Sequence, residues 1–111
     1  LGGTLRSLTI LGLALVESAA IYGLVVMILI LQKIGVDGFT GGQAMGAALS
    51  IALPGLLAGI GEGAVVVGAI KSILRNPADA ANIRTNMIIF IAIVESAAIY
   101  GLVSAILILN K

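Results

Sequence analysis

Two long apolar runs in this sequence each carry a glutamate deep inside them. The runs cover residues 8–31 and 87–109, and a third apolar stretch covers residues 43–73. At about 1.5 Å per residue, a helix of any of these lengths crosses a hydrocarbon core of roughly 30 Å. The connections between the runs are short and polar. The pattern therefore predicts an all-α membrane protein, built from antiparallel transmembrane hairpins in a single membrane domain.

The two glutamate-bearing runs are copies of one another. The letters ESAAIYGLV stand at residues 17–25 and return unchanged at residues 95–103. With the same offset, Arg6 matches Arg84. The repeated unit is about one helical hairpin. It contains, in order, a glutamate-bearing helix, a turn, a glycine-rich helix and a polar loop.

Composition narrows the classes of function. Apolar side chains make up 60% of the chain and charged ones 10%, which is far outside the range of soluble domains. The formal net charge of +1 gives no general attraction to nucleic acid. Because the chain has no cysteine and no histidine, it has no thiol chemistry, no disulfide and no imidazole ligand for haem or zinc. We expect an integral membrane protein that needs no cofactor and itself catalyses no bond chemistry.

The glycine-rich stretch combines close-packing positions with a third carboxylate. Glu62 stands among alternating glycines in the letters GIGEG, and an ionisable side chain inside a membrane span is by default a functional site. Pro54 removes one helical hydrogen bond and is expected to bend this helix. Small residues also recur every four positions, which allows close helix packing, although any tight transmembrane pair has this spacing. They form two series, Ala44, Ala48 and Ala52, then Gly55, Gly59 and Gly63.

Basic residues gather on one side of the predicted spans. Arg6, Lys71, Arg75 and Arg84 lie at or just beyond the span ends on the side of the polar loop at residues 74–86. The opposite side has only two lysines, offset by one aspartate. Because cytoplasmic loops are enriched in lysine and arginine, the polar loop is predicted to be cytoplasmic.

Two of the carboxylates are expected at the same depth. Glu62 precedes Arg75 by 13 residues and Glu95 follows Arg84 by 11. Along antiparallel helices both therefore lie roughly 16 to 20 Å from one membrane edge. Two carboxylates at one depth cannot both stay ionised without a cation, which indicates an ion-binding site.

Hydroxyl groups follow Glu95 on the same predicted helix. Ser96 is adjacent to it. Tyr100 can reach back toward the carboxylate, because helical side chains lean toward the N-terminus. Serine often bonds to its own helix and tyrosine is a common filler of helix packing, so neither residue alone identifies a ligand.

Together these motifs resemble the rotor-ring c subunit, or proteolipid, of rotary ATP synthases and ATPases of the F or V/A type. The resemblance is carried by the letters VESAAIYGLV with the preceding basic loop, and by GIGEG, and it covers nearly the whole chain. It implies that a glycine-rich inner helix and a carboxylate-bearing outer helix form a hairpin, and that many hairpins close into a ring. It also implies further copies of the chain, a stator a-type subunit, the central stalk subunits and membrane lipid as partners. The stalk would contact the loop at Arg75, Asn76 and Pro77.

Carried onto this sequence, the resemblance implies an ion site around Glu95. Glu95 matches the essential ion-carrying carboxylate, and Ser96 and Tyr100 match its hydroxyl partners. The backbone carbonyl of Ile93 would be a further ligand, and Glu62 stands where sodium-binding members usually have glutamine. The first copy of the repeat contains a second set, Glu17, Ser18 and Tyr22.

The transported ion is predicted to be Na⁺ rather than H⁺. A proton needs only one carboxylate, whereas sodium must recover several oxygen contacts, which Glu62, Glu95 and Ser96 would supply as metal ligands. Two carboxylates around one monovalent cation would leave a net charge in lipid, so one carboxyl group must hold a proton. We assign this proton to Glu62.

The order of helices departs from the family pattern, and two other functions stay open. The chain has outer-type, inner-type and outer-type helices, so Glu17 has no inner helix in this sequence and we expect a glycine-rich helix before Leu1. An accessory proteolipid that only oligomerises would lack carboxylates at mid-membrane. A small ion transporter or channel would need polar positions along one helix face rather than at one level.

Overall fold

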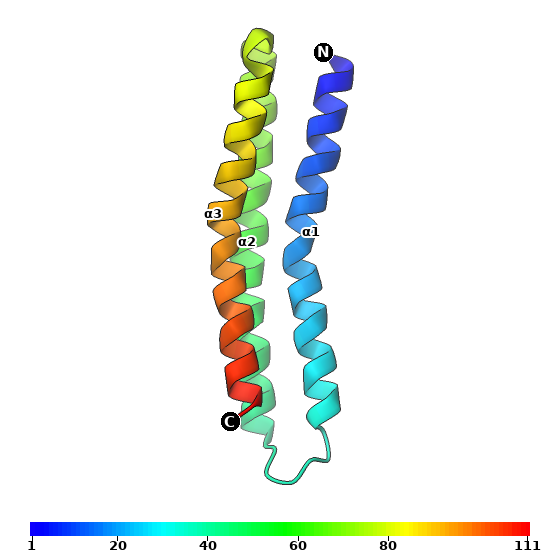
Figure 1. The fold of residues 1–111 in the computed structure, drawn as a ribbon, viewed down its shortest axis with the longest axis vertical. Coiled ribbons are helices and arrows are strands. Elements are labelled where there is room, and N and C mark those ends of the chain that lie inside the picture. Colours follow the sequence, from blue (N-terminus) through cyan, green and yellow to red (C-terminus); the bar gives the residue numbers. More distant parts are fainter.

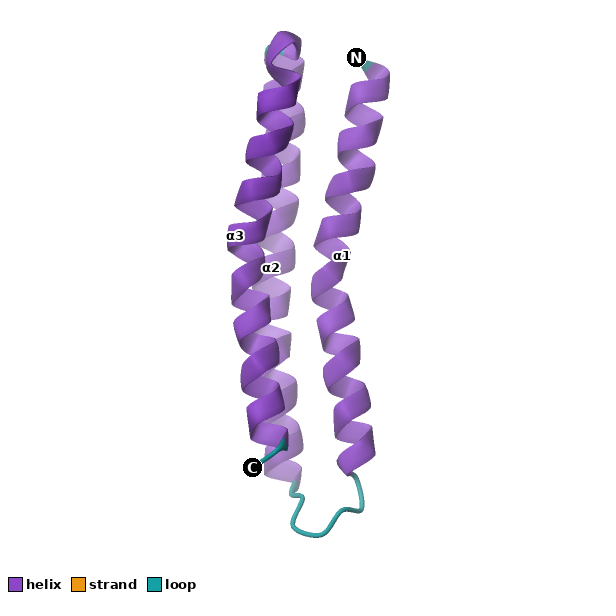
Figure 2. Ribbon diagram, in the orientation of Figure 1, coloured by secondary structure: helices purple, strands orange, loops and turns teal.

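A computed structural model describes the whole chain, residues 1–111, as three long helices joined by two short connections (Figure 1). Their bounds are α1 Gly2–Lys33, α2 Gly41–Arg75 and α3 Ala80–Leu109, with a short 3₁₀ helix η1 at Pro77–Asp79. No strand is present (Figure 2). The helices run antiparallel in sequence order as a rod of 60 × 19 × 15 Å. All three are long and apolar enough to cross a membrane, which confirms the predicted fold class.

Glycines and a helix cap shape the turn between α1 and α2. Gly35 and Gly38 have φ angles of 88° and 84°, in the left-handed region that residues with a Cβ disfavour. Thr40 then begins α2 with a capping box. Its hydroxyl accepts a hydrogen bond from the Gln43 backbone N–H at 3.1 Å, and Gln43 Oε1 accepts one from the Thr40 backbone N–H at 3.0 Å. The antiparallel pairing of α1 and α2 follows from this tight turn.

Most of the polar stretch predicted as a loop, residues 74–86, is helical. α2 ends before Pro77, because proline disfavours helical geometry in the residue that precedes it. Pro77 opens η1, and α3 begins at Ala80, where the Asn82 side chain donates to Asp79 Oδ1 at 2.8 Å. Polar side chains on this segment therefore mark where α3 leaves the apolar layer, and they do not end the helix.

Helix α2 continues through Pro54, and α3 packs closely against this point. The proline leaves the Ser50 carbonyl oxygen without its usual helical donor. Gly101 of α3 lies so close that a Cβ there would overlap this oxygen and would stand 3.0 Å from Pro54 Cγ. Because only glycine fits at this position, the contact determines the register of α3 on α2.

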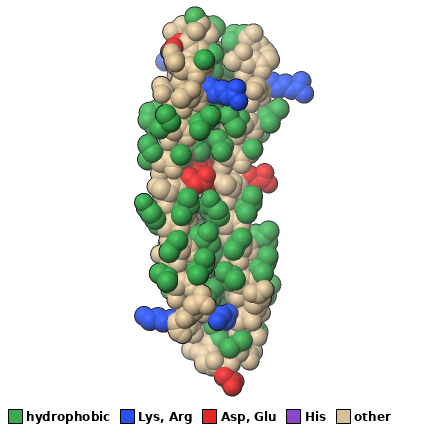
Figure 3. Space-filling model, in the orientation of Figure 1, with side chains coloured by type: hydrophobic (Ala, Val, Ile, Leu, Met, Phe, Trp, Pro, Cys, Tyr) green, Lys and Arg blue, Asp and Glu red, His purple; other side chains and the backbone are tan.

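Apolar side chains form two clusters with a polar level between them, and each cluster takes residues from all three helices. Acidic side chains lie about halfway along the rod as well as at its two ends, whereas lysines and arginines lie only toward the ends (Figure 3). The first cluster contains Leu8, Val66, Ala69, Ile73, Met87 and Ile91. The second contains Val26, Ala47, Ile51, Ala105 and Leu109.

Candidate ion-binding site

Glu62 is the only charged side chain in the buried core. Its exposed fraction is 0%, and neither of its carboxyl oxygens has a hydrogen-bond partner. It lies on α2 between Ala58 and Val66, two other buried residues of the same helix face. A buried carboxylate without a partner is strongly unfavourable. This carboxyl group must therefore either hold a proton or face a cation.

Glu95 of α3 meets a hydroxyl group of α1. Ser18 Oγ lies within hydrogen-bonding distance of Glu95 Oε1, and it is 2.6 Å from the Leu15 carbonyl oxygen of its own helix. A hydroxyl has one proton and can donate to only one of these oxygens at a time. When Ser18 donates to Leu15, a protonated Glu95 can donate to Ser18; when Glu95 is ionised, Ser18 can donate to it. The contact accommodates both forms of the carboxyl group.

The two carboxyl groups and one tyrosine lie near one another. Glu95 is a near neighbour of Glu62, and Tyr22 lies near both. With Ser18, these residues form a site that draws on all three helices. α1 contributes the two hydroxyl groups, α2 contributes the buried carboxyl group and α3 contributes the half-buried one.

Other residues singled out from the sequence make no hydrogen bond to Glu62 or Glu95. Ser96 Oγ donates to the Ile93 carbonyl oxygen at 2.6 Å, which is the local bond that serine often makes in a helix. Tyr100 is 69% exposed and Ile93 is 63% exposed, and Glu17 is exposed on α1. In this chain, the hydroxyl group that meets Glu95 thus belongs to the first copy of the repeat and not to the second. The sequence already offered Ser18 as a candidate, since both copies of the repeat contain the serine. The packing of α1 decides which of the two serines reaches Glu95.

The set of ligands suits a small hard cation. No group of three or more acidic, histidine or cysteine side chains that could hold a metal ion is present, so the site consists of two carboxyl groups with hydroxyl groups beside them. Such oxygen atoms are the ligands that hard cations prefer. One proton together with one monovalent cation would neutralise the two carboxylates.

The basic connection lies far from the carboxyl groups. Arg75, Asn76 and Pro77 are exposed at the end of the rod where α2 passes into α3 (Figure 1). This position leaves their side chains accessible to a partner outside the membrane.

Comparison with known proteins assigns the chain to a family. The family model for the c subunit of ATP synthase matches residues 45–108, more than half of the chain, and the match includes Glu62 and Glu95. The chain belongs to this family. Membership confirms the predicted resemblance to rotor c subunits, and with it an ion-translocating membrane subunit that forms a ring of copies within an ATP synthase complex. Helix α1 lies outside the matched residues and is related to α3 through the internal repeat.

Curated relatives share the matched region. An ATP synthase c subunit of Pelobacter propionicus is 43% identical over 65 residues, which cover 59% of this chain and 71% of that protein. The ATP synthase c subunit of Geotalea uraniireducens is 42% identical over the same length and shares of each chain. The ATP synthase c subunit of Syntrophomonas wolfei is 36% identical over 70 residues, which cover 63% of this chain and 97% of that protein. No solved structure matches the chain.

Proposed function

We propose that this chain carries Na⁺ across the membrane as a rotor subunit, with Glu95, Glu62 and Ser18 as the ion ligands. The observation that carries the proposal is the fully buried, unpartnered carboxyl group of Glu62 beside Glu95. An accessory proteolipid that only oligomerises has no use for such a pair. A channel would need polar groups along its whole length, whereas here apolar clusters lie on both sides of the pair.

Charge balance assigns a role to each carboxyl group. Glu62 has no exposed surface and holds a proton, so that it offers a carbonyl oxygen to the ion. Glu95 is ionised against Na⁺, and Ser18 supplies a hydroxyl oxygen from α1. The occupied site is then neutral and can pass through lipid as the ring turns. The membrane potential loads or unloads it with about 2.3 kcal/mol per charge per 100 mV.

A proton as the transported ion is the second candidate, and one observation favours it. Ser18 Oγ is 2.6 Å from the Leu15 carbonyl oxygen while it also contacts Glu95. If the serine donates to that carbonyl, Glu95 needs a proton of its own. The same site can therefore be neutral with two protons, and only a direct test of ion dependence separates the two functions.

The internal repeat extends the same assignment to neighbouring sites in the ring. Ser96 and Tyr100 occupy on α3 the places that Ser18 and Tyr22 occupy on α1. We assign Ser96 and Tyr100 to the carboxylate of the adjoining unit, where a repeated outer helix presents a counterpart of Glu95. In the same scheme, the Ile93 carbonyl oxygen, which accepts from Ser96, belongs to that adjoining site.

Helix α1 has an open face that suits a glycine-rich helix of the adjoining unit. Its exposed residues there are Leu13, Met27 and Leu31, at 63%, 51% and 58%. The repeat matches these positions to Ile91, Ala105 and Leu109 of α3, all of which are buried against α2. We propose that α1 packs on an inner-type helix in the ring in the same way as α3 packs on α2.

The remaining partners follow from the ends of the rod. The exposed connection at Arg75, Asn76 and Pro77 is proposed to contact the central stalk on the cytoplasmic side, because basic residues are more numerous at this end. A stator a-type subunit is proposed to exchange the ion with Glu95 at the middle of the membrane. Lipid surrounds the exposed apolar surface of the ring.

Carbodiimide modification of Glu95 tests the proposal, because the reagent attacks a protonated carboxyl group in the apolar layer. Sodium is expected to protect Glu95 and potassium is not, and protection should weaken as the pH falls because protons compete for the same carboxylate. The measurement is the rate of labelling, by peptide mass spectrometry, at several pH values with each salt. Labelling that ignores sodium at every pH would make this a proton site.

Two variants of the buried residue sharpen this experiment. Glu62→Gln keeps a carbonyl oxygen on a side chain of the same length, so the sodium concentration that half-protects Glu95 should change less than about threefold. Glu62→Leu removes the ligand oxygen and should raise this concentration by about tenfold or more. Equal protection in both variants would show that Glu62 is no ligand.

A further inference from the structure

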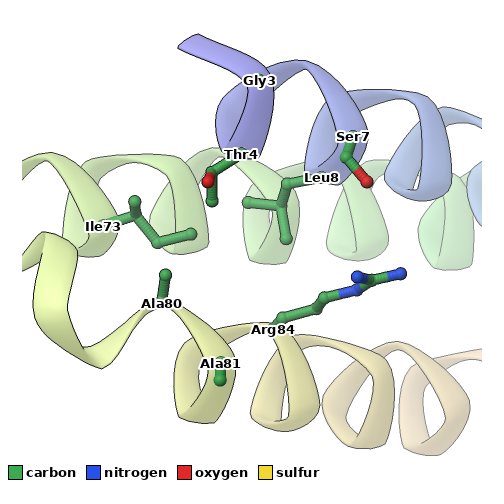
Figure 4. Close-up of a pocket in the computed structure, with 8 residues that line it drawn as sticks. All are labelled: Gly3, Thr4, Ser7, Leu8, Ile73, Ala80, Ala81 and Arg84. Atoms are coloured by element: carbon green, nitrogen blue, oxygen red, sulfur yellow. The ribbon is translucent and has the colours of Figure 1, made fainter. Parts of the chain in front are cut away.

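A groove unrelated to the carboxyl groups lies between α1 and α3 at the end of the rod near the α2–α3 connection. Its volume is about 420 Å³. Thr4 and Ser7 of α1 lie on one side and Arg84 of α3 on the other, and Figure 4 shows the guanidinium group reaching into the space between the two helices. Leu8 and Ile73, both buried, form its apolar floor.

The polar groups of this groove have no partner within the chain. No hydrogen bond engages the hydroxyl groups of Thr4 and Ser7, and none engages the guanidinium group of Arg84. Thr9, one turn farther along α1, instead donates to the Leu5 carbonyl oxygen at 2.8 Å. The groove thus presents two free hydroxyl groups and a free cation to whatever occupies it.

A second groove continues from the first toward the apolar part of the rod. It has a volume of about 530 Å³, and both grooves are lined by Gly3, Ser7 and Arg84. Beyond these shared residues the second groove adds Arg6 and the apolar residues Ile10, Leu11 and Ala14. The polar end lies just outside the apolar runs that begin at residues 8 and 87, and the apolar end lies inside them. The surface is therefore polar at the membrane boundary and apolar below it.

The charge at this end of the molecule is positive. Arg84 lines both grooves and Arg6 lines the second, while Lys71 and Arg75 lie on α2 at the same end. Asp79 is the one acidic residue there, and its carboxylate already accepts a hydrogen bond from Asn82. An anion at the boundary would be attracted, and guanidinium groups bind phosphate through paired hydrogen bonds.

We propose that the two adjoining grooves together bind the phosphate-bearing headgroup of an anionic phospholipid and the start of its acyl chains. Arg84 and Arg6 bind the phosphate, and the hydroxyl groups of Thr4 and Ser7 donate hydrogen bonds to its oxygen atoms. The first acyl carbons lie along Ile10, Leu11 and Ala14. A soluble phosphate ion would use only the polar end, whereas a lipid uses both ends. The bound lipid bridges two outer-type helices and so stabilises the contact between successive repeats.

Native mass spectrometry of the full chain in detergent tests this proposal, with dioleoyl phosphatidylglycerol as the anionic probe and dioleoyl phosphatidylcholine as the zwitterionic one. Arg84→Gln is expected to weaken phosphatidylglycerol binding about fivefold, the effect of removing one basic contact to an anionic lipid. Lys71→Gln, which removes the same charge from an exposed site outside the groove, should change it less than about twofold. Phosphatidylcholine should bind more weakly than phosphatidylglycerol to the unchanged chain.

Two further arms identify the ligand and control for folding. Arg84→Lys keeps the charge and should retain more phosphatidylglycerol binding than Arg84→Gln, with the same helical circular dichroism. Inorganic phosphate at the same concentration as the lipid should not displace phosphatidylglycerol, because phosphate cannot contact the apolar end of the groove. Equal losses in Arg84→Gln and Lys71→Gln would show a diffuse positive surface, and displacement by phosphate would show a site for the free ion; either result overturns the proposal.

Discussion

At the scale of single residues, the distinctive group is a carboxyl group that the fold buries without a partner. Glu62 has apolar neighbours along its helix and Glu95 beside it. A buried carboxylate without a partner is unfavourable, and a proton or a cation removes that cost. The hydroxyl group of Ser18 adds a neutral oxygen that can donate or accept as Glu95 changes its form. These properties fit the roles proposed above, in which Glu62 is an ion ligand and Glu95 exchanges the ion.

A pair of serine variants tests which helix provides the hydroxyl group that contacts each carboxylate. In Ser18→Ala, Glu95 loses its hydroxyl partner, so the sodium concentration for half protection of Glu95 from carbodiimide should rise about fivefold. Ser96→Ala is the matched control, because Ser96 bonds only to the Ile93 carbonyl oxygen in this chain. Ser96→Ala should leave the carbodiimide labelling of Glu95 unchanged and should instead affect the labelling of Glu17 in the assembled ring.

Peptide mass spectrometry separates the labelling of the two glutamates in one experiment. If Ser96→Ala weakened protection of Glu95 more than Ser18→Ala did, the hydroxyl group at Glu95 would come from its own helix. The assignment of α1 to the site of α3 would then be wrong.

At the scale of helices, the glycines of this chain have different roles. Gly101 and Gly12 lie at close approaches, where a Cβ would overlap the Ser50 carbonyl oxygen in one case and stand 2.7 Å from Val66 Cγ2 in the other. Gly59 and Gly63 have no atom within 4 Å of a Cβ built on them. Within one chain, therefore, Gly59 and Gly63 do not determine how the helices pack.

Substitution at Gly101 should destabilise the α2–α3 pair. In Gly101→Ala the added methyl group meets a backbone oxygen that cannot move aside, so we expect the free energy of unfolding to fall by about 1–3 kcal/mol. Gly59→Ala is the control, since its methyl group enters open space and alanine favours helix by up to about 1 kcal/mol. The measurement is unfolding of the purified chain by dodecyl sulfate, followed by circular dichroism. Identical unfolding curves for the two variants would contradict the close approach at position 101.

At the scale of the whole molecule, the two copies of the outer-type helix bury different faces. α1 buries Leu8, Gly12 and Val26, whereas the matching positions of α3, Asn86, Phe90 and Ser104, are exposed. The helix face that is buried in one copy is therefore exposed in the other. Such faces generate head-to-tail contacts, which close into a ring when the rotation between units allows it.

Ring assembly should therefore depend on an α1 face that the single chain leaves exposed. Leu13→Ala combined with Leu31→Ala removes side chains that we expect to be buried between units, and it should lower the yield of detergent-stable ring by at least about tenfold. Ile21→Ala combined with Ile28→Ala is the control, because these residues lie on a different exposed face of the same helix. Native mass spectrometry counts the copies in each ring. An equal yield from both double variants would show that the Leu13 face is not an interface.

The amino-acid sequence alone was sufficient to predict the number of membrane spans, the internal repeat and the common depth of Glu62 and Glu95. Hydropathy and residue spacing are local properties, and a helix converts spacing directly into depth. This is why Glu62 and Glu95 could be placed at one level before any contact was known. Family membership could also be predicted, because the motifs around the two glutamates are contiguous along the chain.

Tertiary structure decided which copies of identical motifs meet. Residues 17–25 and 95–103 have the same letters, so no local pattern can say whether Glu95 pairs with Ser18 or with Ser96. That choice depends on the rotation of α1 against α2 and α3, which close contacts such as that of Gly12 with Val66 determine. The groove at Arg84 likewise exists only because the ends of α1 and α3, far apart in sequence, lie side by side. Contacts between distant residues are set by packing in three dimensions, and a sequence pattern records only which faces are able to pack.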